Sequence, residues 1–226
     1  MNQAFVSWSG GKDCCLAFYK AITAGLNIRY LANMLTKDGT HSRTHGLSAD
    51  ILQLQSQAIG IPLLQRQATW DTYEDEFKKL LGSLKQEEIS NGIFGDIDLD
   101  EHREWVERIC VTAGITPHLP LWGRRQDEIL SDFIFLGFEA VVVATRADLL
   151  GEEWLGRKID LDFINQLTEF PKTNNITLCG EAGEYHTLVV DGPIFQKRLE
   201  IQETGKALRD EHWFLDIIEI DLKNRL

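Results

Sequence analysis

Ser9-Gly10-Gly11-Lys12-Asp13 lies between a short apolar run, Ala4 to Trp8, and the start of a helical pattern. Two adjacent glycines let the backbone turn tightly and expose consecutive amide groups. A helix beginning near Asp13 adds the positive end of its dipole, so an anion is favoured at this turn. The stretch does not fit the pattern G-x-x-x-x-G-K-[ST]. It therefore predicts a phosphate site of another kind, and the simpler alternative is a tight turn with an ordinary helix cap.

Outward from this turn, the first half alternates apolar strand-like runs with amphipathic helical patterns. Such alternation predicts βαβ units and a parallel sheet, with ligands bound at the carboxyl ends of the strands. The fold class we expect is α/β, with a Rossmann-like N-terminal domain. The expected strands after the first are Ile28–Leu35, Pro62–Ala68 and Ile89–Ile93, and the expected helices are Ser48–Ile59, Thr72–Gln86 and one around Val106–Ala113.

Beyond Pro120 the pattern changes to fewer helices and more separate strands. We expect a smaller C-terminal α+β domain and place a boundary near residue 125, which gives domains 1–125 and 126–226. The expected elements are a helix at Ile129–Ile134, a buried strand at Ala140–Ala144, a helix from Asp160 to Phe170 stopped by Pro171, and strands at Thr187–Val190, Gln196–Ile201 and Phe214–Ile220.

Composition narrows the class of protein. The 226 residues carry 23 basic and 35 acidic side chains, a net charge of −12, which disfavours a nucleic-acid partner. No apolar run approaches the roughly 20 residues of a membrane-spanning helix, and the N-terminus does not fit a secretion signal. We therefore expect a cytoplasmic protein without a membrane contact. The four cysteines form no C-x-x-C pair, which argues against a zinc site or a disulfide framework.

A second polar stretch runs from Cys179 to Thr187, with the sequence Cys-Gly-Glu-Ala-Gly-Glu-Tyr-His-Thr. Its two carboxylates, Glu181 and Glu184, are followed by a phenol and an imidazole, a set that could bind a cation or move protons. Its glycines would let a substrate approach the backbone. From chemistry alone, a polar turn before a strand is an equally good interpretation.

Together these stretches resemble a known group of proteins. Ser9 to Asp13 is similar to the S-G-G-x-D-S fingerprint of the PP-loop ATP pyrophosphatases, with Cys14 in place of the last serine. Glu181 to Tyr185 resembles the E-G-G-E-[YF] segment of the diphthine–ammonia ligase family, with Ala182 at a glycine position. His45-Gly46 and Gly95-Asp96-Ile97 agree with that family too. The resemblance covers almost the whole chain.

The resemblance implies an ATP-dependent ligase. A carboxylate attacks the α phosphate of ATP, pyrophosphate leaves, and ammonia displaces AMP to form an amide. ATP, ammonia and Mg²⁺ are then the expected ligands, and the expected partner is elongation factor 2 carrying diphthine. The residues assigned to ATP are Ser9, Gly10, Gly11, Lys12, Asp13, Cys14, His45 and Gly95; to Mg²⁺, Asp96; to the acceptor, Glu181, Gly183, Glu184, Tyr185 and Arg157; to catalysis, Lys12, Asp13, Glu181, Glu184 and His186.

Several of these assignments have a structural alternative. His45 could cap or pack instead of touching ATP, Asp96 could cap the helix that follows it, and Arg157 could pair with an acidic neighbour. Lys12 and Asp13 are expected at an exposed loop–helix junction, where replacing them should change stability little.

Other functions remain alternatives. Members resembling the family also occur in bacteria, which lack diphthine, so the acceptor could be a different carboxylate. A PP-loop enzyme that thiolates tRNA would need a catalytic cysteine pair and a basic face, and neither is evident. A nucleotide-binding regulator without turnover is the alternative outside enzymes. The sequence leaves a homodimer open.

Overall fold

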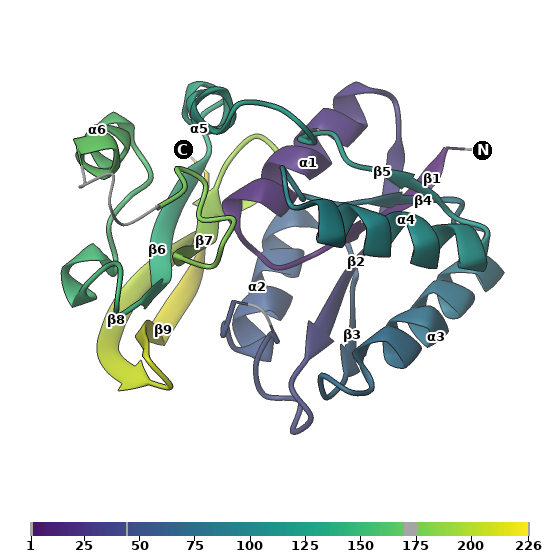
Figure 1. Cartoon of the computed structure of the whole chain (residues 1–226), viewed down its shortest axis with the longest axis horizontal. Coiled ribbons are helices and arrows are strands. Elements are labelled where there is room, and N and C mark those ends of the chain that lie inside the picture. Colours follow the sequence, from purple (N-terminus) through teal and green to yellow (C-terminus); the bar gives the residue numbers. More distant parts are fainter. Residues whose placement is uncertain (1, 44, 170–175, 226) are drawn as a thin grey trace.

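The computed structural model describes residues 2–43, 45–169 and 176–225, and its strands form two sheets (Figure 1). The first sheet has the order β3-β2-β1-β4-β5, and all its strand pairs are parallel. This confirms the expected α/β fold with a Rossmann-like sheet. Its strands are β1 (Gln3–Ser7), β2 (Asn27–Leu35), β3 (Leu63–Gln67), β4 (Asn91–Ile93) and β5 (Thr116–His118).

Helices cover both faces of this sheet. Successive side chains of β1 point in opposite directions, so β1 supplies buried side chains to both faces. Phe5 belongs to the core beneath two of the helices, α3 and α4, whereas Ala4 and Val6 belong to the core beneath α1 and α2. The carboxyl ends of the strands therefore form an edge lined from several loops. The helices are α1 (Lys12–Thr23), α2 (Ala49–Ile59), α3 (Tyr73–Gln86) and α4 (Asp100–Ala113).

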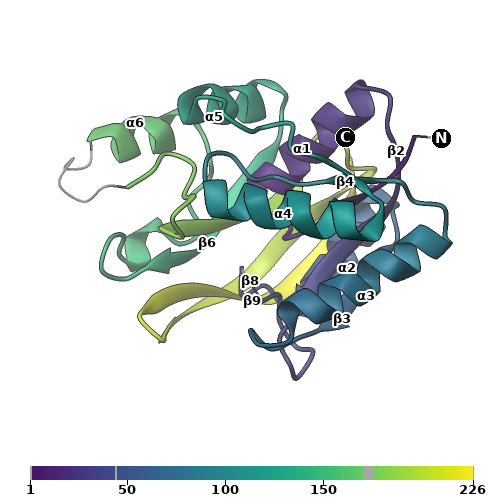
Figure 2. The same cartoon turned by 45° about the vertical axis from the view of Figure 1, so that its right-hand side comes forward.

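The second sheet is antiparallel, with the order β7-β6-β9-β8. Figure 2 shows the long β8–β9 hairpin reaching beside α2, which it contacts. This agrees with the expected smaller α+β part. Its elements are α5 (Gln126–Phe135), β6 (Glu139–Arg146), the 3₁₀ helix η1 (Glu152–Trp154), α6 (Leu161–Glu169), β7 (Tyr185–Asp191), β8 (Lys197–Arg209) and β9 (His212–Asn224).

Three elements differ from the sequence expectations. β8 and β9 extend well past the expected strands Gln196–Ile201 and Phe214–Ile220. The sequence did not predict the added residues as strand, because they are mostly exposed and carry no apolar alternation. β5 was not expected, because a three-residue strand containing Pro117 gives little signal; it lies at the edge of its sheet, where proline is tolerated. Asp160 caps α6 as expected, accepting from the Phe163 N–H at 2.9 Å. Phe170 and Pro171 lie outside the described residues.

The two sheets share one hydrophobic core, which includes side chains from β1, α1 and α2 together with β6 and β7. Backbone contact is direct as well, since the Val189 N–H of β7 donates to the Gly10 carbonyl at 3.0 Å. The division near residue 125, just before α5, stays a prediction. No helix within the described ranges is long and apolar enough to cross a membrane.

Candidate active site

The glycine turn adopts a backbone that demands glycine. Gly10 has φ +81°, and a Cβ there would lie 2.6 Å from Leu52 Cδ2. Gly11 is the N-cap of α1, and a Cβ on it would lie 2.5 Å from the His45 ring. Both glycines therefore let the chain pass close to its neighbours while α1 starts at the next residue, with its first amide groups at the sheet edge.

The turn is held in place by hydrogen bonds from both halves of the chain. The Lys12 N–H donates to Thr187 Oγ1 at 3.0 Å. The Gln55 amide donates to the Gly10 carbonyl at 3.0 Å and to the Val189 carbonyl at 2.8 Å, and accepts from the Trp8 indole at 2.8 Å. Sequence reasoning missed Gln55. Its signal was a polar residue on the apolar face of the helix expected at Ser48–Ile59.

Lys12 and Asp13 form an ion pair inside the protein. Their Nζ–Oδ2 distance is 2.8 Å, and Lys12 also donates to the Cys179 carbonyl and lies 5.1 Å from the centre of the Tyr185 ring. Lys12 is only 3% exposed, which corrects the expectation of an exposed junction. Burial alone would lower the pKa of Lys12, but the Asp13 charge raises it above its ordinary value, so the ammonium persists.

One carboxylate oxygen of Asp13 has no hydrogen-bond partner among the described residues. Its Oδ2 meets Lys12, whereas its Oδ1 is buried without a hydrogen-bond partner among the described residues. Burial raises the pKa of Asp13, and the Lys12 charge opposes that rise. An orphaned carboxylate oxygen at this edge of the sheet suits a ligand that carries a proton or a positive charge.

Cys14 and Gly95 complete the wall around the turn. The Cys14 thiol donates to the Gly11 carbonyl at 3.2 Å, and the Ser9 hydroxyl lies 3.5 Å from the same sulfur. A Cβ on Gly95 would lie 2.9 Å from the backbone of Asp13 and Cys14. The loop after β4 thus packs directly on the start of α1.

A cleft of about 710 Å³ opens above this edge, with walls from both halves of the chain. Most of the predicted site residues line it. Those brought together there are Ser9, Lys12, Asp13, Cys14, His45, Gly95, Asp96, Glu181, Gly183, Tyr185 and His186.

One wall of the cleft is acidic. Glu181 Oε2 accepts from the Ile97 N–H at 3.3 Å, and burial followed by the Asp13 charge raises the pKa of Glu181 to about 7. Asp96 lies 3.3 Å from His102 Nδ1, and it does not cap α4, whose N-cap is Leu99. Within the described ranges, no three His, Cys, Asp or Glu side chains form a ready metal cluster.

His45 and His186 form another wall. Their rings stack with centroids 4.4 Å apart and planes 30° apart. Burial lowers the pKa of His186 to about 4 and that of His45 well below its usual value, so both rings are neutral near pH 7. The pair therefore presents hydrogen-bonding nitrogens without a charge.

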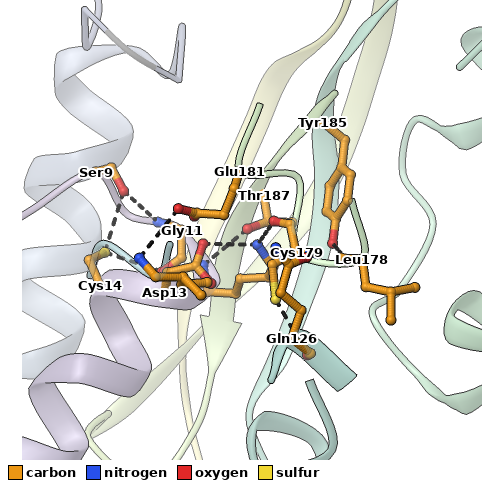
Figure 3. A network of polar contacts seen from close by, with 12 residues as sticks. Ser9, Gly11, Asp13, Cys14, Gln126, Leu178, Cys179, Glu181, Tyr185 and Thr187 are labelled. Atoms are coloured by element: carbon orange, nitrogen blue, oxygen red, sulfur yellow. Dashed lines mark hydrogen bonds and ion pairs between the residues drawn. The ribbon is translucent and has the colours of Figure 1, made fainter. Parts of the chain in front are cut away.

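Glu184 lies apart from the other predicted site residues. It is 1% exposed and does not line the cleft; its Oε1 accepts from the Thr177 N–H at 2.6 Å. Tyr185 does line the cleft, but its hydroxyl donates to the Leu178 carbonyl at 2.6 Å (Figure 3). The part of Tyr185 that contacts Lys12 is its ring. The carboxylate of Glu184 therefore holds the turn that precedes β7.

Arg157 also lies apart from the other predicted site residues. Its guanidinium lies 4.5 Å from the Trp154 ring centre, 2.8 Å from Gln166 Oε1 and 3.5 Å from Asp162 Oδ2. It does not line the cleft. Of the two roles considered for Arg157, the structure shows pairing with an acidic neighbour, since α6 supplies both polar contacts.

The parallel sheet, the glycine turn at the start of α1 and the buried lysine–aspartate pair define a nucleotide-binding α/β protein of the PP-loop type. Family models agree in detail. The diphthamide synthase N-terminal domain matches residues 2–117, and the diphthamide synthase C-terminal domain matches residues 125–223. The chain belongs to this family.

Curated relatives share most of the chain. The diphthine–ammonia ligase of Danio rerio is 29% identical, over 92% of this chain and 90% of that protein. The human diphthine–ammonia ligase is 27% identical, over 96% and 91%. These relatives confirm the family and its class, an ATP-dependent ligase. A solved structure of a predicted subunit of tRNA methyltransferase from Methanocaldococcus jannaschii has a TM-score of 0.46 at 14% identity, covering 85% of this chain and 98% of that one.

Proposed function

We propose that this protein is an ATP-dependent amide ligase that cleaves ATP into AMP and pyrophosphate. It activates a carboxylate as an acyl-adenylate, and ammonia then attacks the acyl carbon and releases AMP. The observation that carries the proposal is the glycine turn and the Lys12–Asp13 pair at one end of a cleft whose acidic wall includes Glu181. The relatives named diphthine–ammonia ligase support the same reaction.

Each part of the cleft has a task in this reaction. The amide groups at the start of α1 receive the β and γ phosphates, and Lys12 adds a positive charge as pyrophosphate departs. Glu181, whose pKa is raised to about 7, is suited to take a proton from ammonium before ammonia attacks. The neutral His45–His186 pair and the Tyr185 ring limit water around the reacting groups.

Mg²⁺ fits the acidic wall. Magnesium in phosphate sites is held by one or two carboxylates together with phosphate oxygens. Asp13, whose Oδ1 has no hydrogen-bond partner among the described residues, and Asp96 both line the cleft and would hold it. When bound, the ion would neutralise charge on the leaving pyrophosphate.

The acceptor we propose is diphthine on elongation factor 2, with ammonia as the second substrate, as the names of the relatives suggest. A cytoplasmic location follows from such a substrate. The division into domains 1–125 and 126–226, with the acceptor held by the second, is part of the same proposal. Association into a homodimer remains a prediction.

Product analysis tests the proposal. Labelled ATP would be incubated with the protein, Mg²⁺, ammonium and elongation factor 2 taken from cells that lack their own ligase. We expect AMP and pyrophosphate in equal amounts, with amidated diphthine seen by mass spectrometry. Release of ADP and phosphate would contradict the reaction class, and release of AMP only with another carboxylate would contradict the acceptor.

A further inference from the structure

Arg43 lines the same cleft and has no assigned task. It follows β2, donates through Nη1 to the Ala68 carbonyl at 3.3 Å, and places its guanidinium 4.2 Å from the centre of the Trp70 ring. Within the described residues Arg43 forms no ion pair. Every other arginine there forms one except Arg29, which is exposed on β2. An unpaired guanidinium in a cleft of so acidic a chain needs an explanation.

The chain itself shows how its arginines hold carboxylates. Arg125 donates to Asp127 through Nε and Nη2 at 3.0 and 2.6 Å. Arg146 donates to Asp148 through the same two atoms at 3.1 and 2.8 Å. In Arg43 the Nε and Nη2 atoms have no hydrogen-bond partner among the described residues, and the Nε–H is buried without an acceptor. A buried donor without an acceptor is unfavourable, so a small turn of the guanidinium toward an anion would be stabilising.

The other cations of the cleft are engaged. Lys12 is paired with Asp13, and His102 lies against Asp96. The stacked imidazoles of His45 and His186 carry no charge near neutral pH.

The acidic side chains that line the same cleft, Asp13, Asp96 and Glu181, offer no positive charge to a carboxylate. A carboxylate approaching the α phosphate of ATP is itself an anion meeting an anion, so it needs a positive charge on its own side. Arg43 is the cation that the described part of the cleft offers for it.

We propose that Arg43 binds the acceptor carboxylate and holds it for attack on the α phosphate, while Trp70 keeps the guanidinium plane in place. The inference rests on the proposed function and adds the residue that recognises its acceptor. Trp70 is 65% exposed at the cleft, which leaves room for a substrate carried on another protein. Arg43 takes the role that the sequence suggested for Arg157.

Three variants test this assignment. Arg43→Met removes the charge, Arg43→Lys keeps the charge but cannot donate through both Nε and Nη2, and Arg29→Met is the control, an unpaired arginine on β2 outside the cleft. Two quantities are measured on each: the Kd of a non-hydrolysable ATP analogue by calorimetry, and the KM for diphthine-bearing elongation factor 2 in AMP release. Melting temperatures confirm that each variant folds.

We expect Arg43→Met to raise the acceptor KM at least thirtyfold and Arg43→Lys about tenfold, with the analogue Kd within threefold and Arg29→Met unchanged. An equal loss of analogue affinity would show that Arg43 serves ATP phosphates and would overturn the proposal. An unchanged acceptor KM would overturn it too.

A second arm separates this inference from the proposed acceptor. If the wild type releases no AMP with diphthine-bearing elongation factor 2, the proposed acceptor fails, and binding of glycine betaine, a small trimethylated carboxylate, is measured by saturation-transfer NMR on the analogue-bound protein. Binding that disappears in Arg43→Met and persists in Arg29→Met supports the carboxylate site. Binding that persists in Arg43→Met, or that is absent in the wild type, overturns it.

Discussion

The turn from Ser9 to Asp13 and the segment from Cys179 to His186 both line one cleft, yet their residues are used differently. In the turn, neighbouring residues act together, because amide groups at a helix start point the same way. In the segment before β7, neighbouring side chains diverge. Glu181 enters the cleft, whereas Glu184 is buried against the Thr177 amide.

This difference shows how much of a site a sequence motif determines. Matching residues at a helix N-terminus fix both the chemical groups and the direction in which they point, so the proposed phosphate site follows from the sequence alone. Two carboxylates in an irregular turn fix only the chemistry. Their environments then separate them: the cleft raises the pKa of Glu181 to about 7, while a backbone N–H holds Glu184 in place.

The largest effect is expected at Lys12, in the turn from Ser9 to Asp13. Lys12→Met should lower the rate of AMP release at least a hundredfold, about 2.7 kcal/mol of transition-state stabilisation. It should also destabilise the protein by about 3 kcal/mol, since the buried Asp13 loses its partner. Steady-state kinetics and urea unfolding measure the two effects.

The double variant Lys12→Met with Asp13→Asn is the control for this prediction. It removes both charges, so it should regain most of the stability while staying inactive. A Lys12→Met protein of normal stability would show that the pair is not coupled, and one of normal activity would remove Lys12 from the reaction.

A smaller effect should divide the two glutamates. Glu181→Gln should lower AMP release about tenfold, about 1.4 kcal/mol, without changing the melting temperature, because it loses only the charge that faces the cleft. Glu184→Ala should keep activity within about threefold but lose about 1–3 kcal/mol of stability, since the Thr177 N–H is left without its acceptor.

Glu184→Gln is the matched control, because its amide oxygen can still accept from Thr177. It should resemble the wild type in both activity and stability. If Glu184→Gln were inactive at normal stability, the buried carboxylate would belong to the reaction after all, and the contrast between the two glutamates would be wrong.

Much of the fold was predictable because it depends on local patterns. The helix at Ala49–Ile59 has a serine N-cap whose Oγ accepts from the Ile51 N–H, and it ends at Gly60 in the left-handed region, both signals visible in the letters. β5 and the far halves of β8 and β9 were missed, since their pairing partners are fixed by topology and their outer residues are polar.

The site divides in the same way. The phosphate turn needed only adjacent residues, whereas Gln55 and Arg43 depend on chain segments far apart in sequence. Gln55 joins Trp8 to Val189, and Arg43 is positioned by Ala68 and Trp70. Arg157 shows the converse, because the sequence could not reveal that its side chain contacts Gln166 and Asp162 on α6. Local sequence shows which groups exist but not which are already engaged.

The smallest effect concerns the imidazole wall and appears as a pH dependence of stability. Burial, and then the charges of Lys12 and His212, lower the pKa of His186 to about 4, whereas in the unfolded chain it is near 6.5. Between these values the unfolded state binds the extra proton, so the folded state loses stability as the pH falls below about 6.5 and gains nothing above it. His186→Phe keeps a ring to stack on His45 but cannot titrate, and His45 itself titrates in both proteins. Urea unfolding at pH 7.5 and pH 5.5 should therefore show the wild type losing about 1 kcal/mol more than the variant. Equal losses in the two proteins would mean that His186 is not held neutral by its surroundings. The His45–His186 pair would then carry a charge that changes with pH.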